Sequence, residues 1–524
     1  MIVAGPEVEL PRTSLTSFVL QHAEEHGSRI AVVDVDGRVS YTFADLVSRV
    51  RRAAQGLREL GLRPGDVVAI LAPNVPEYPI AYHAIALAGG VVTALNPLDT
   101  PADLEDRLGE TGVRYLVTVP QEMPKVRALL DRTDVEQVVV LGEAEGATPF
   151  AALERAEPIV QTALDPSEEV VTILHSSGST GLPKGVLLTH RNMIAKALLT
   201  SAVAPNEPGD KALAMPPFHH AFGLSMMMNA SLYQGTTLVT VERFDPETFL
   251  RAIEEHRITR LYVVPTIAVL LARSPLVDRF DLSSLRSIVS GGAALDPSVA
   301  ARVRERLGCE IGQGYGLTEA MVAFMQTPGG TSPASVGRAA PGVEAKIVDV
   351  ATGAVLGRGR SGEVLVRGPQ VMKGYLNAPV ATAAVLEPDG FLHTGDMGYL
   401  DADGELVIVD RIKELIKYKG QQVSPVELEA VLVRHPKVLD AAVVGVPDEE
   451  SSEIPKGFVV AQEPVTAQEI MDWVAERVAP YKKIRQIEFI DRIPRTPVGK
   501  VERRTLSGRA AVEASPSRST APLR

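Results

Sequence analysis

Short apolar runs alternate with helical patterns along roughly the first 340 residues. Runs at 67–72, 91–94, 113–119 and 138–141 are typical of buried strands, and residues 78–88 between the first two predict a helix. Further runs of the same kind stand at 170–174, 237–241, 261–264 and 287–289. Buried strands separated by helices indicate largely parallel sheets covered by helices. The pattern therefore predicts the α/β class, with stacked sheets in a large N-terminal domain.

The pattern changes after about residue 340. Residues 345–350, 362–367 and 405–409 read as short strands separated by Gly- and Asp-rich turns. Such turns favour antiparallel pairing, and we expect a small β-barrel-like subdomain here. A domain boundary is predicted within residues 410–413.

A small α+β domain is expected beyond this boundary, with a length of about a hundred residues. Its predicted strands are 441–446, 456–461 and 486–490, and Ser-Pro-Val-Glu at 424–427 and Thr-Ala-Gln-Glu at 466–469 are two predicted capping boxes that open helices. The last stretch lacks aromatic residues and periodicity, which predicts disorder. The expected domains are thus 1–410, a mobile 411–506 and a disordered tail, 507–524.

Composition narrows the class of protein. The 524 residues exceed one ordinary domain, and the formal charge of −12 argues against nucleic acid as a partner. Cys309 is the single cysteine, so an intramolecular disulfide is excluded, and a small buried hydrophobe is its expected role. The first residues carry acidic groups and no basic stretch before an apolar run, and runs such as 81–87 are too short to span a bilayer. We expect a cytoplasmic protein without integral membrane association.

The most informative stretch is SSGSTGLPKG at residues 176–185. Three glycines let backbone N–H groups turn towards an anion, hydroxyls add donors, and Lys184 adds a cation. The segment predicts a triphosphate cradle, although it lacks the Gly-Lys-Ser/Thr end of a Walker A loop. A flexible Gly/Ser loop is the alternative interpretation.

With this loop the chain resembles the adenylate-forming superfamily, which includes acyl- and aryl-CoA ligases, firefly luciferase and the adenylation domains of peptide synthetases. The resemblance rests on an ordered set of motifs: QGYGLTE at 313–319, FLHTGD at 391–396, DRIKELIKYKG at 410–420 and PRTPVGK at 494–500. It covers residues 15 to 506. It implies an enzyme that joins a carboxylate to the α-phosphate of ATP, releases pyrophosphate, and passes the acyl group to coenzyme A.

The resemblance also assigns roles to individual residues. Glu319 would hold Mg²⁺, Thr318 would bond the α-phosphate, and Lys500 would bridge carboxylate and phosphate during adenylation. Asp396 and Arg411 would reach the ribose. The remaining expected nucleotide contacts are Ser176, Ser177, Gly178, Ser179, Thr180, Gly181, Lys184, Gly291, Gly292, Ala293, Gly314, Tyr315 and Gly316.

A second set of residues is assigned to thioester formation. Lys417 and Gln422 would lie on the opposite face of the small domain, and Gly420 would let the pantetheine arm pass. The resemblance implies a hinge near residues 410–413, with Lys413 as hinge lysine, that swings the small domain between two poses. A solvated lysine-rich face is the alternative interpretation of this segment.

The acid site is expected around HHAFG at 219–223, where His220 matches the histidine beside the substrate carboxylate. The expected pocket residues are Phe222, Gly223, Met226, Gly291, Gly314, Met321 and Val322. Plant coumarate ligases carry Gly-Pro where this chain has Met321 and Val322, and these larger side chains argue against a coumarate-sized pocket. An aryl and an aliphatic acid both stay open.

The sequence also leaves open which molecule accepts the acyl group. Basic residues gather in the small domain, at Lys417, Lys419, Lys482, Lys483, Arg485, Arg503 and Arg504. They suit the phosphates of coenzyme A and equally the acidic face of an acyl carrier protein, and some members of the superfamily use a non-thiol acceptor. A binding protein without catalysis is the alternative of another class, and the presence of Lys500 and Glu319 argues against it. The sequence does not distinguish a monomer from a homodimer.

Overall fold

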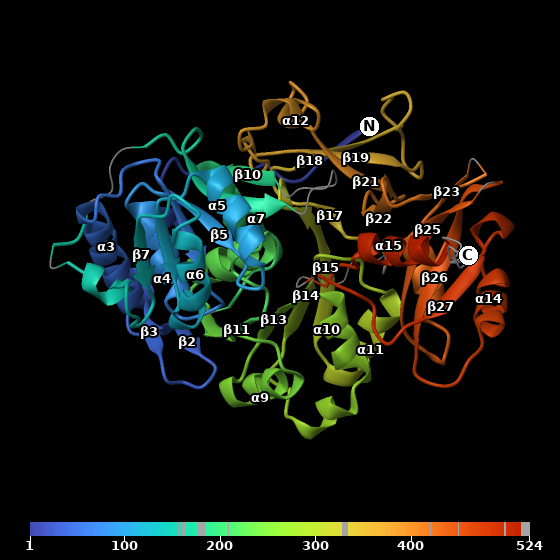
Figure 1. Cartoon of the computed structure of the whole chain (residues 1–524), viewed down its shortest axis with the longest axis horizontal. Coiled ribbons are helices and arrows are strands. Elements are labelled where there is room, and N and C mark those ends of the chain that lie inside the picture. The colour runs from blue at the N-terminus through green and yellow to red at the C-terminus, as the bar shows by residue number, and fades with distance from the viewer. Residues whose placement is uncertain are drawn as a thin grey trace, which may run out of the picture.

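The computed structural model describes residues 1–155, 157–159, 164–176, 184–207, 209–326, 334–419, 421–448, 450–496 and 499–514, the last four by backbone alone. Two sheets form the body of the large domain (Figure 1). The first has the order β20 (Gly374–Tyr375), β10 (Lys184–Thr189), β9 (Val170–Ser176), β5 (Val91–Leu95), β4 (Val67–Leu71), β6 (Tyr115–Thr118), β7 (Gln137–Val140) and β8 (Thr148–Pro149). The second has the order β17 (Arg338–Ala339), β16 (Met321–Met325), β15 (Glu310–Leu317), β14 (Ser287–Ser290), β13 (Arg260–Val263), β11 (Lys211–Ala214), β12 (Thr237–Thr240), β2 (Ile30–Asp34) and β3 (Ser40–Thr42). Most neighbours within each sheet pair in parallel, as the apolar runs predict.

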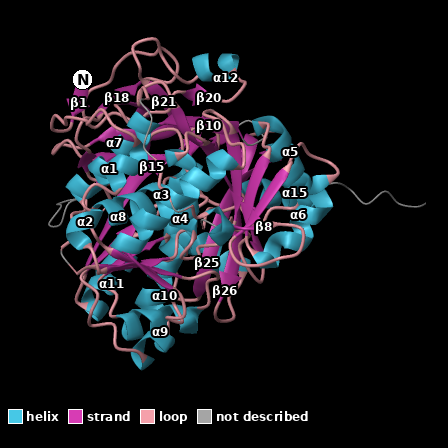
Figure 2. Ribbon diagram, turned by 90° about the vertical axis from the view of Figure 1, so that its left-hand side faces the viewer, coloured by secondary structure: helices cyan, strands magenta, loops and turns pink. Residues whose placement is uncertain are grey.

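Both faces of each sheet are covered. In β4, Val68 and Ile70 belong to the core between the sheets, whereas Ala69 and Leu71 pack on the outer side. The inner layer contains α1 (Leu15–Val19), α3 (Phe43–Glu59), α4 (Tyr78–Leu87), α7 (His190–Val203), the π-helix η3 (Phe222–Asn229) and α8 (Ala230–Tyr233). The outer helices are α5 (Pro101–Thr111) and α6 (Met123–Leu130) on the first sheet, and α9 (Pro246–His256), α10 (Pro265–Arg273) and α11 (Pro297–Leu307) on the second. Figure 2 shows α5 and α6 on the side of the first sheet away from α3 and α4.

Helix α4 shows why the inner layer is stable. All ten of its residues are buried, because it is enclosed between the two sheets, and Tyr78 and Tyr82 are among the largest fully buried side chains. Full burial on every side explains why the sequence has an apolar run here without an amphipathic stripe.

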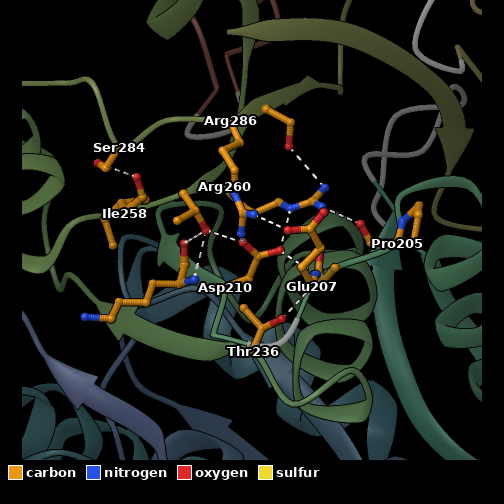
Figure 3. Close-up of polar contacts among 12 residues, drawn as sticks. Pro205, Glu207, Asp210, Thr236, Ile258, Arg260, Ser284 and Arg286 are labelled. Atoms are coloured by element: carbon orange, nitrogen blue, oxygen red, sulfur yellow. Dashed lines mark hydrogen bonds and ion pairs between the residues drawn. The ribbon is translucent and has the colours of Figure 1, made fainter.

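A charged cluster fixes the amino edge of the second sheet (Figure 3). Asp210 is fully buried before β11, and it accepts hydrogen bonds from Arg260 Nε at 3.0 Å and Thr259 Oγ1 at 2.6 Å. Arg286, before β14, also pairs with Asp210. The strands are parallel, so these hydrogen bonds and ion pairs stabilise the amino edge of the sheet. The carboxyl ends of β13 and β14 lie at the opposite edge and are left for the loops that carry function.

A third, antiparallel sheet follows, as predicted for the region after residue 340. Its order is β1 (Ile2–Ala4), β18 (Glu344–Val348), β19 (Gly362–Arg367), β21 (Leu392–Leu400) and β22 (Leu406–Arg411). The short helix α12 (Pro379–Ala383) lies beside β20. The expected boundary at 410/411 falls at the end of β22, and the division into domains stays a prediction.

The small α+β region contains β23 (Ile416–Tyr418), β24 (Gln421–Val423), α13 (Pro425–Leu432), β25 (Val438–Asp448), β26 (Ser452–Ala461), α14 (Ala467–Ala475), β27 (Gln486–Phe489) and α15 (Arg503–Ala514). Ser424 and Thr466 cap α13 and α14 through their hydroxyls, as predicted. The second half of each predicted capping box is replaced by an ion pair, because Glu427 binds Lys482 and Glu469 binds Lys437.

The predicted disordered tail is wrong for residues 507–514, which belong to α15. Leu506 and Ala510 lie one turn apart on this helix and are buried against the β25–β26 side of the small sheet. Two small apolar contacts at i and i+4 suffice to hold the helix, and alanine-rich stretches favour helix. Residues 515–524 lie outside the described residues. Among the helices that the structure describes, none has the length and hydropathy needed to cross a bilayer.

Candidate active site

The predicted phosphate cradle begins and ends on neighbouring strands. β9 ends at Ser176 and β10 begins at Lys184, and the two residues are paired across the antiparallel ladder. Ser177, Gly178, Ser179, Thr180 and Gly181 lie outside the described residues. At the rim, the Ser176 hydroxyl is buried without a hydrogen-bond partner among the described residues. The Lys184 ammonium lies 5.3 Å from the centre of the Tyr375 ring.

Tyr375 connects this rim to Glu319. Its hydroxyl donates to Glu319 Oε1 at 2.9 Å, and Met372 N donates to the Glu319 carbonyl at 2.7 Å. Thr318 is half-buried in the same turn between β15 and β16. The described residues contain no group of three or more His, Cys, Asp or Glu side chains that could hold a metal ion by themselves. A single carboxylate beside a phosphate site fits Mg²⁺, which takes most of its oxygen ligands from substrate phosphates and water.

The two residues expected to reach the ribose lie together. Asp396 is buried on β21, where it accepts a hydrogen bond from the Tyr315 hydroxyl at 2.6 Å and pairs with Arg411 Nε at 3.3 Å. Burial raises the pKa of the Asp396 carboxyl, and the Arg411 guanidinium opposes that rise. Strand register explains the pair, because Asp396 and Arg411 are direct partners between β21 and β22.

Glycines shape the floor of the site. A Cβ on Gly316 would lie 2.0 Å from the Met321 carbonyl, so only glycine fits at this point of β15. Gly291 follows β14, and a Cβ there would lie 3.2 Å from the Phe222 ring. Gly292 and Ala293 are exposed beyond it, and Gly314 lies against Met325. The SGGA segment thus meets Phe222, and the QGYG segment packs against β16.

The small domain inserts Lys500 into this site. The pKa of the Lys500 ammonium is lowered by burial and by Arg411, and Asp396 and Glu319 act in the opposite direction. Its loop is a closed turn in which Thr496 N donates to the Lys500 carbonyl at 2.8 Å and Arg495 Nη1 donates to the Gly499 carbonyl at 3.0 Å. Gly499 lies so close to Val264 that an added Cβ would be 3.2 Å from it. The loop is therefore seated on the large domain.

His220 lies near enough to Lys500 for its charge to act on the imidazole. Its Nδ1 accepts a hydrogen bond from Phe222 N at 3.2 Å. Burial, and then the Lys500 ammonium, lower the pKa of His220 to about 3. The ring is therefore neutral near pH 7 and can accept or donate one hydrogen bond without adding charge.

A cleft of about 950 Å³ leads to this point from the surface. Phe222 and His219 line it from the large domain, and Thr496 and Gly499 line it from the Lys500 loop. Leu98, also in its wall, is 76% exposed. The volume of the cleft is in the size range of ligand sites.

Lys417 and Gln422 lie elsewhere in this pose. They are cross-strand partners in β23 and β24, both are exposed, and Lys417 N donates to Glu453 within the small domain. Gly420 lies outside the described residues. Lys413, the expected hinge lysine, has a pKa lowered by burial and by Lys184 and Arg411. It therefore lies near the predicted phosphate cradle.

The expected acid pocket is lined by buried side chains. Phe222, Gly223 and Met226 lie on η3, and Met321 and Val322 begin β16. Met321 has a φ of 47°, a left-handed conformation that favours glycine. The backbone at residue 321 thus has a conformation that suits the glycine found there in plant coumarate ligases. The methionine side chain fills the space that a glycine would leave open.

Tyr375, Glu414 and Lys196 were missed by the sequence reasoning. Tyr375 follows an isolated glycine, Gly374, and does not belong to a periodic pattern of apolar residues. An aromatic residue in such a turn was a possible sign of a role in the site. Glu414 lies within the hinge motif and pairs with Arg503 at 2.8 Å. Lys196 is a lysine inside a buried helix, and only its unusual position in an apolar face could have marked it.

Buried histidines predict an acid-sensitive fold. Burial lowers the pKa of His83 and His220 to about 3, and of His175, His190 and His219 to about 4. Unfolded histidine has a pKa near 6.5, so stability is fully present above that pH. It falls by about 1.4 kcal/mol per pH unit per histidine as pH drops towards the folded values. Urea denaturation at pH 7.5, 6.5, 5.5 and 5.0 should show this loss.

A matched pair of variants checks the assignment. His83→Gln should reduce the slope of stability against pH below 6.5, and His22→Gln, with a side chain 41% exposed, should leave it unchanged. A wild-type stability that stays constant between pH 7.5 and 5.0 would contradict the prediction.

Comparison with known proteins agrees with this geometry. A family model described as "AMP-binding enzyme" matches residues 19–376, and one described as "AMP-binding enzyme C-terminal domain" matches residues 427–500. A 4-coumarate–CoA ligase of Oryza sativa subsp. japonica is 39% identical over 520 residues, which cover 97% of this chain and 94% of that protein.

Solved structures are similar over almost the whole chain. The anthranilate CoA ligase AuaEII, in complex with anthranoyl-AMP, superposes with a TM-score of 0.90 at 28% identity and covers 97% of this chain and 99% of its own. The amide bond synthetase McbA of Marinactinospora thermotolerans superposes with a TM-score of 0.85 at 31% identity and covers 95% and 99%. The chain therefore belongs to the AMP-binding enzyme family and is a member of the adenylate-forming superfamily.

Proposed function

We propose that this protein is an AMP-forming acid–CoA ligase that activates a carboxylic acid with ATP and then transfers the acyl group to coenzyme A. The observation that carries the proposal is that Lys500 of the small domain lies near enough to Asp396 and Glu319 of the large domain for both carboxylates to act on its pKa. A carboxylate that attacks a phosphate brings two anions together, so catalysis depends on positive charge and in-line positioning. The buried Lys500 ammonium supplies that charge where nucleotide and acid would meet.

The other residues have matching roles in the proposal. Asp396 and Arg411 hold the ribose, and Thr318 bonds the α-phosphate. Glu319 would hold Mg²⁺, and the ion when bound would offset charge on the phosphate oxygens. His220, being neutral, orients the substrate carboxylate without repelling or neutralising it.

Lys184 and Lys413 add positive charge at the rim of the predicted phosphate cradle. Lys184 is one of the groups that lower the pKa of Lys413, so the two ammonium groups lie near each other. Both would interact favourably with a triphosphate, and this supports the proposed nucleotide site at the ends of β9 and β10.

The acceptor is proposed to enter through the cleft beside Phe222. The cleft reaches the loop that carries Lys500, and Lys417 and Gln422 face solvent on the far strands of the small domain. A rotation of the small domain near residues 410–413 would withdraw Lys500 and present this second face. Asp410 marks the pivot, because its carboxylate accepts hydrogen bonds from Ser424 Oγ at 2.5 Å and Val426 N at 3.1 Å.

An amide-forming reaction is the second candidate function, because McbA, an amide bond synthetase, is as similar to the chain as the CoA ligase structures are. Pyrophosphate exchange across a panel of acids tests activation, and product mass after addition of coenzyme A, a carrier protein or an amine tests the acceptor. We expect exchange with at least one acid and acyl-CoA as product. Exchange with none of the acids would count against the proposal, and an amide as sole product would favour the second candidate.

Lys417→Ala tests the two poses. We expect acyl-CoA formation from a supplied acyl-adenylate to fall about tenfold or more, because a positioned cation is lost from the thioester step. Pyrophosphate exchange should change less than threefold. The matched control is Arg492→Ala, at an exposed basic residue elsewhere in the small domain. Equal losses in both half-reactions of Lys417→Ala would contradict a separate thioester pose.

A further inference from the structure

Lys196 is a lysine in the interior of the large domain. It lies on α7, its side chain is 1% exposed, and its Nζ has no hydrogen-bond partner among the described residues. It is one of the largest fully buried side chains of the chain. Neither the fold nor the adenylation chemistry described above gives it a role.

The direction of the side chain follows from its neighbours. Asn192, one helical turn earlier, donates to the carbonyl oxygens of Pro369 and Val371 at 2.9 and 2.7 Å. The next residue of that segment, Met372, bonds the Glu319 carbonyl. Residues four apart share a helix face, so Lys196 lies on the face of α7 turned towards the turn between β15 and β16. The effect of Glu319 on the pKa of Lys196 confirms this orientation.

The helix of Lys196 packs against the two elements that carry most of the expected acid-pocket residues. Helix α7 packs against η3, which carries Phe222 and Met226, and against β16, which begins with Met321 and Val322. Lys196 therefore brings a cationic group into a mostly apolar layer, in which Ser225 and Asn229 of η3 are buried neutral polar side chains. Glu319 does not satisfy it, since that carboxylate accepts from Tyr375 and no ion pair with Lys196 is formed in the described structure.

A buried ammonium without a counter-ion is costly. Transfer of an ion from water into a protein interior costs several kcal/mol unless a partner offsets it. Burial lowers the pKa of Lys196 to about 7, which is the direction expected for an amine that lacks an anion. A group retained at such cost on the wall of a substrate site is a candidate for ligand recognition.

We propose that Lys196 is a specificity-determining residue, and that the acid activated here carries a second anionic oxygen group, such as a carboxylate, remote from the reacting carboxylate. The inference rests on the proposed acid activation and names the class of acid. The second anion pairs with the Lys196 ammonium at the inner end of the pocket. The reacting carboxylate then lies at the other end, beside His220 and Lys500.

Pairs of acids of equal shape test the proposal. A carboxylate and an isopropyl group have similar size, so terephthalate is compared with 4-isopropylbenzoate, 4-carboxycinnamate with 4-isopropylcinnamate, and adipate with 6-methylheptanoate. We expect pyrophosphate exchange to favour the dicarboxylic member of at least one pair by tenfold or more in kcat/KM, because a site built around a polar group rejects a ligand that leaves it unpaired.

Two variants connect the preference to Lys196. Lys196→Met keeps the length of the side chain and removes the charge; it should lower kcat/KM for the dicarboxylic acid at least tenfold and raise it for the isopropyl acid. Lys196→Arg keeps the charge and should retain the wild-type order of the two acids. The gain towards the isopropyl acid shows that Lys196→Met is folded.

The remaining outcomes overturn the inference. A wild-type protein that uses both members of every pair equally, or prefers the isopropyl members, activates acids but does not recognise a second anion. A preference that Lys196→Met leaves unchanged assigns the recognition to another residue. Better use of 4-hydroxybenzoate than of terephthalate excludes an anion as the recognised group. Exchange with isopropyl acids alone overturns this inference and leaves the proposed function intact, whereas exchange with none counts against both.

Discussion

Lys500→Ala is expected to reduce pyrophosphate exchange by about 10²–10³-fold, because it removes a preorganised charge from the point where two anions meet. Hydrogen bonds to the Lys500 and Gly499 carbonyls hold the backbone that carries the ammonium, and Gly499 is in contact with Val264. Solvent cations cannot replace it at that position without the same preorganisation. The measurement is exchange of labelled pyrophosphate into ATP at saturating acid.

The second half-reaction separates a catalytic loss from a folding loss. The Lys500→Ala protein should still convert a supplied acyl-adenylate and coenzyme A to acyl-CoA at a rate within about threefold of wild type, since that step is proposed to use Lys417. Arg492→Ala is the matched control, because Arg492 is an exposed basic residue of the small domain eight positions earlier. If Lys500→Ala lost both half-reactions to the same degree, a role confined to adenylation would be wrong.

Asp396→Asn is expected to raise the KM for ATP by about 10²-fold. The carboxylate would accept charge-assisted hydrogen bonds from the ribose, and each is worth roughly 1.5–3 kcal/mol. The amide keeps the shape of the side chain, but it removes the charge that pairs with Arg411. Initial rates of pyrophosphate exchange at varied ATP concentration measure the change.

Stability should change along with binding. The Arg411 side chain is 40% exposed, so solvent screens the ion pair, and the stability measured by urea denaturation should fall by no more than about 1 kcal/mol in Asp396→Asn. Asp403→Asn, at an exposed position in the same antiparallel sheet region, should change neither the KM nor the midpoint. An unchanged KM for ATP in a folded Asp396→Asn protein would remove the ribose assignment.

The apolar runs predicted the elements of the two large sheets well. The predicted strand at 67–72 corresponds to β4 and the predicted helix at 78–88 to α4, because full burial gives runs without polar interruption. The order of strands within a sheet was not predictable in this way, since β9 lies beside β5 although some 75 residues separate them in sequence. Pairing between distant segments depends on packing that a local pattern does not contain.

The residues of the site also divide into those that the sequence predicted and those that it did not. Motif order predicted Lys500, Asp396 and Glu319, and the structure brings them within electrostatic reach of one another. Tyr375 was not predicted because its function comes from a contact with Glu319, 56 residues away. Lys196 was not predicted because the feature that marks it is an ammonium group without a hydrogen-bond partner among the described residues. Only the coordinates can show that feature. The tail was misjudged because two buried residues, Leu506 and Ala510, are too few for a visible period.

The contact of Gly499 with Val264 has a consequence for the order of events in time. While Gly499 is in contact with Val264, residues of the Lys500 loop form one wall of the cleft and block the proposed path of the thiol. An incoming nucleophile must wait until the turn has lifted, and by then the first product has been made. We therefore expect ping-pong kinetics, in which pyrophosphate departs before the second substrate is admitted.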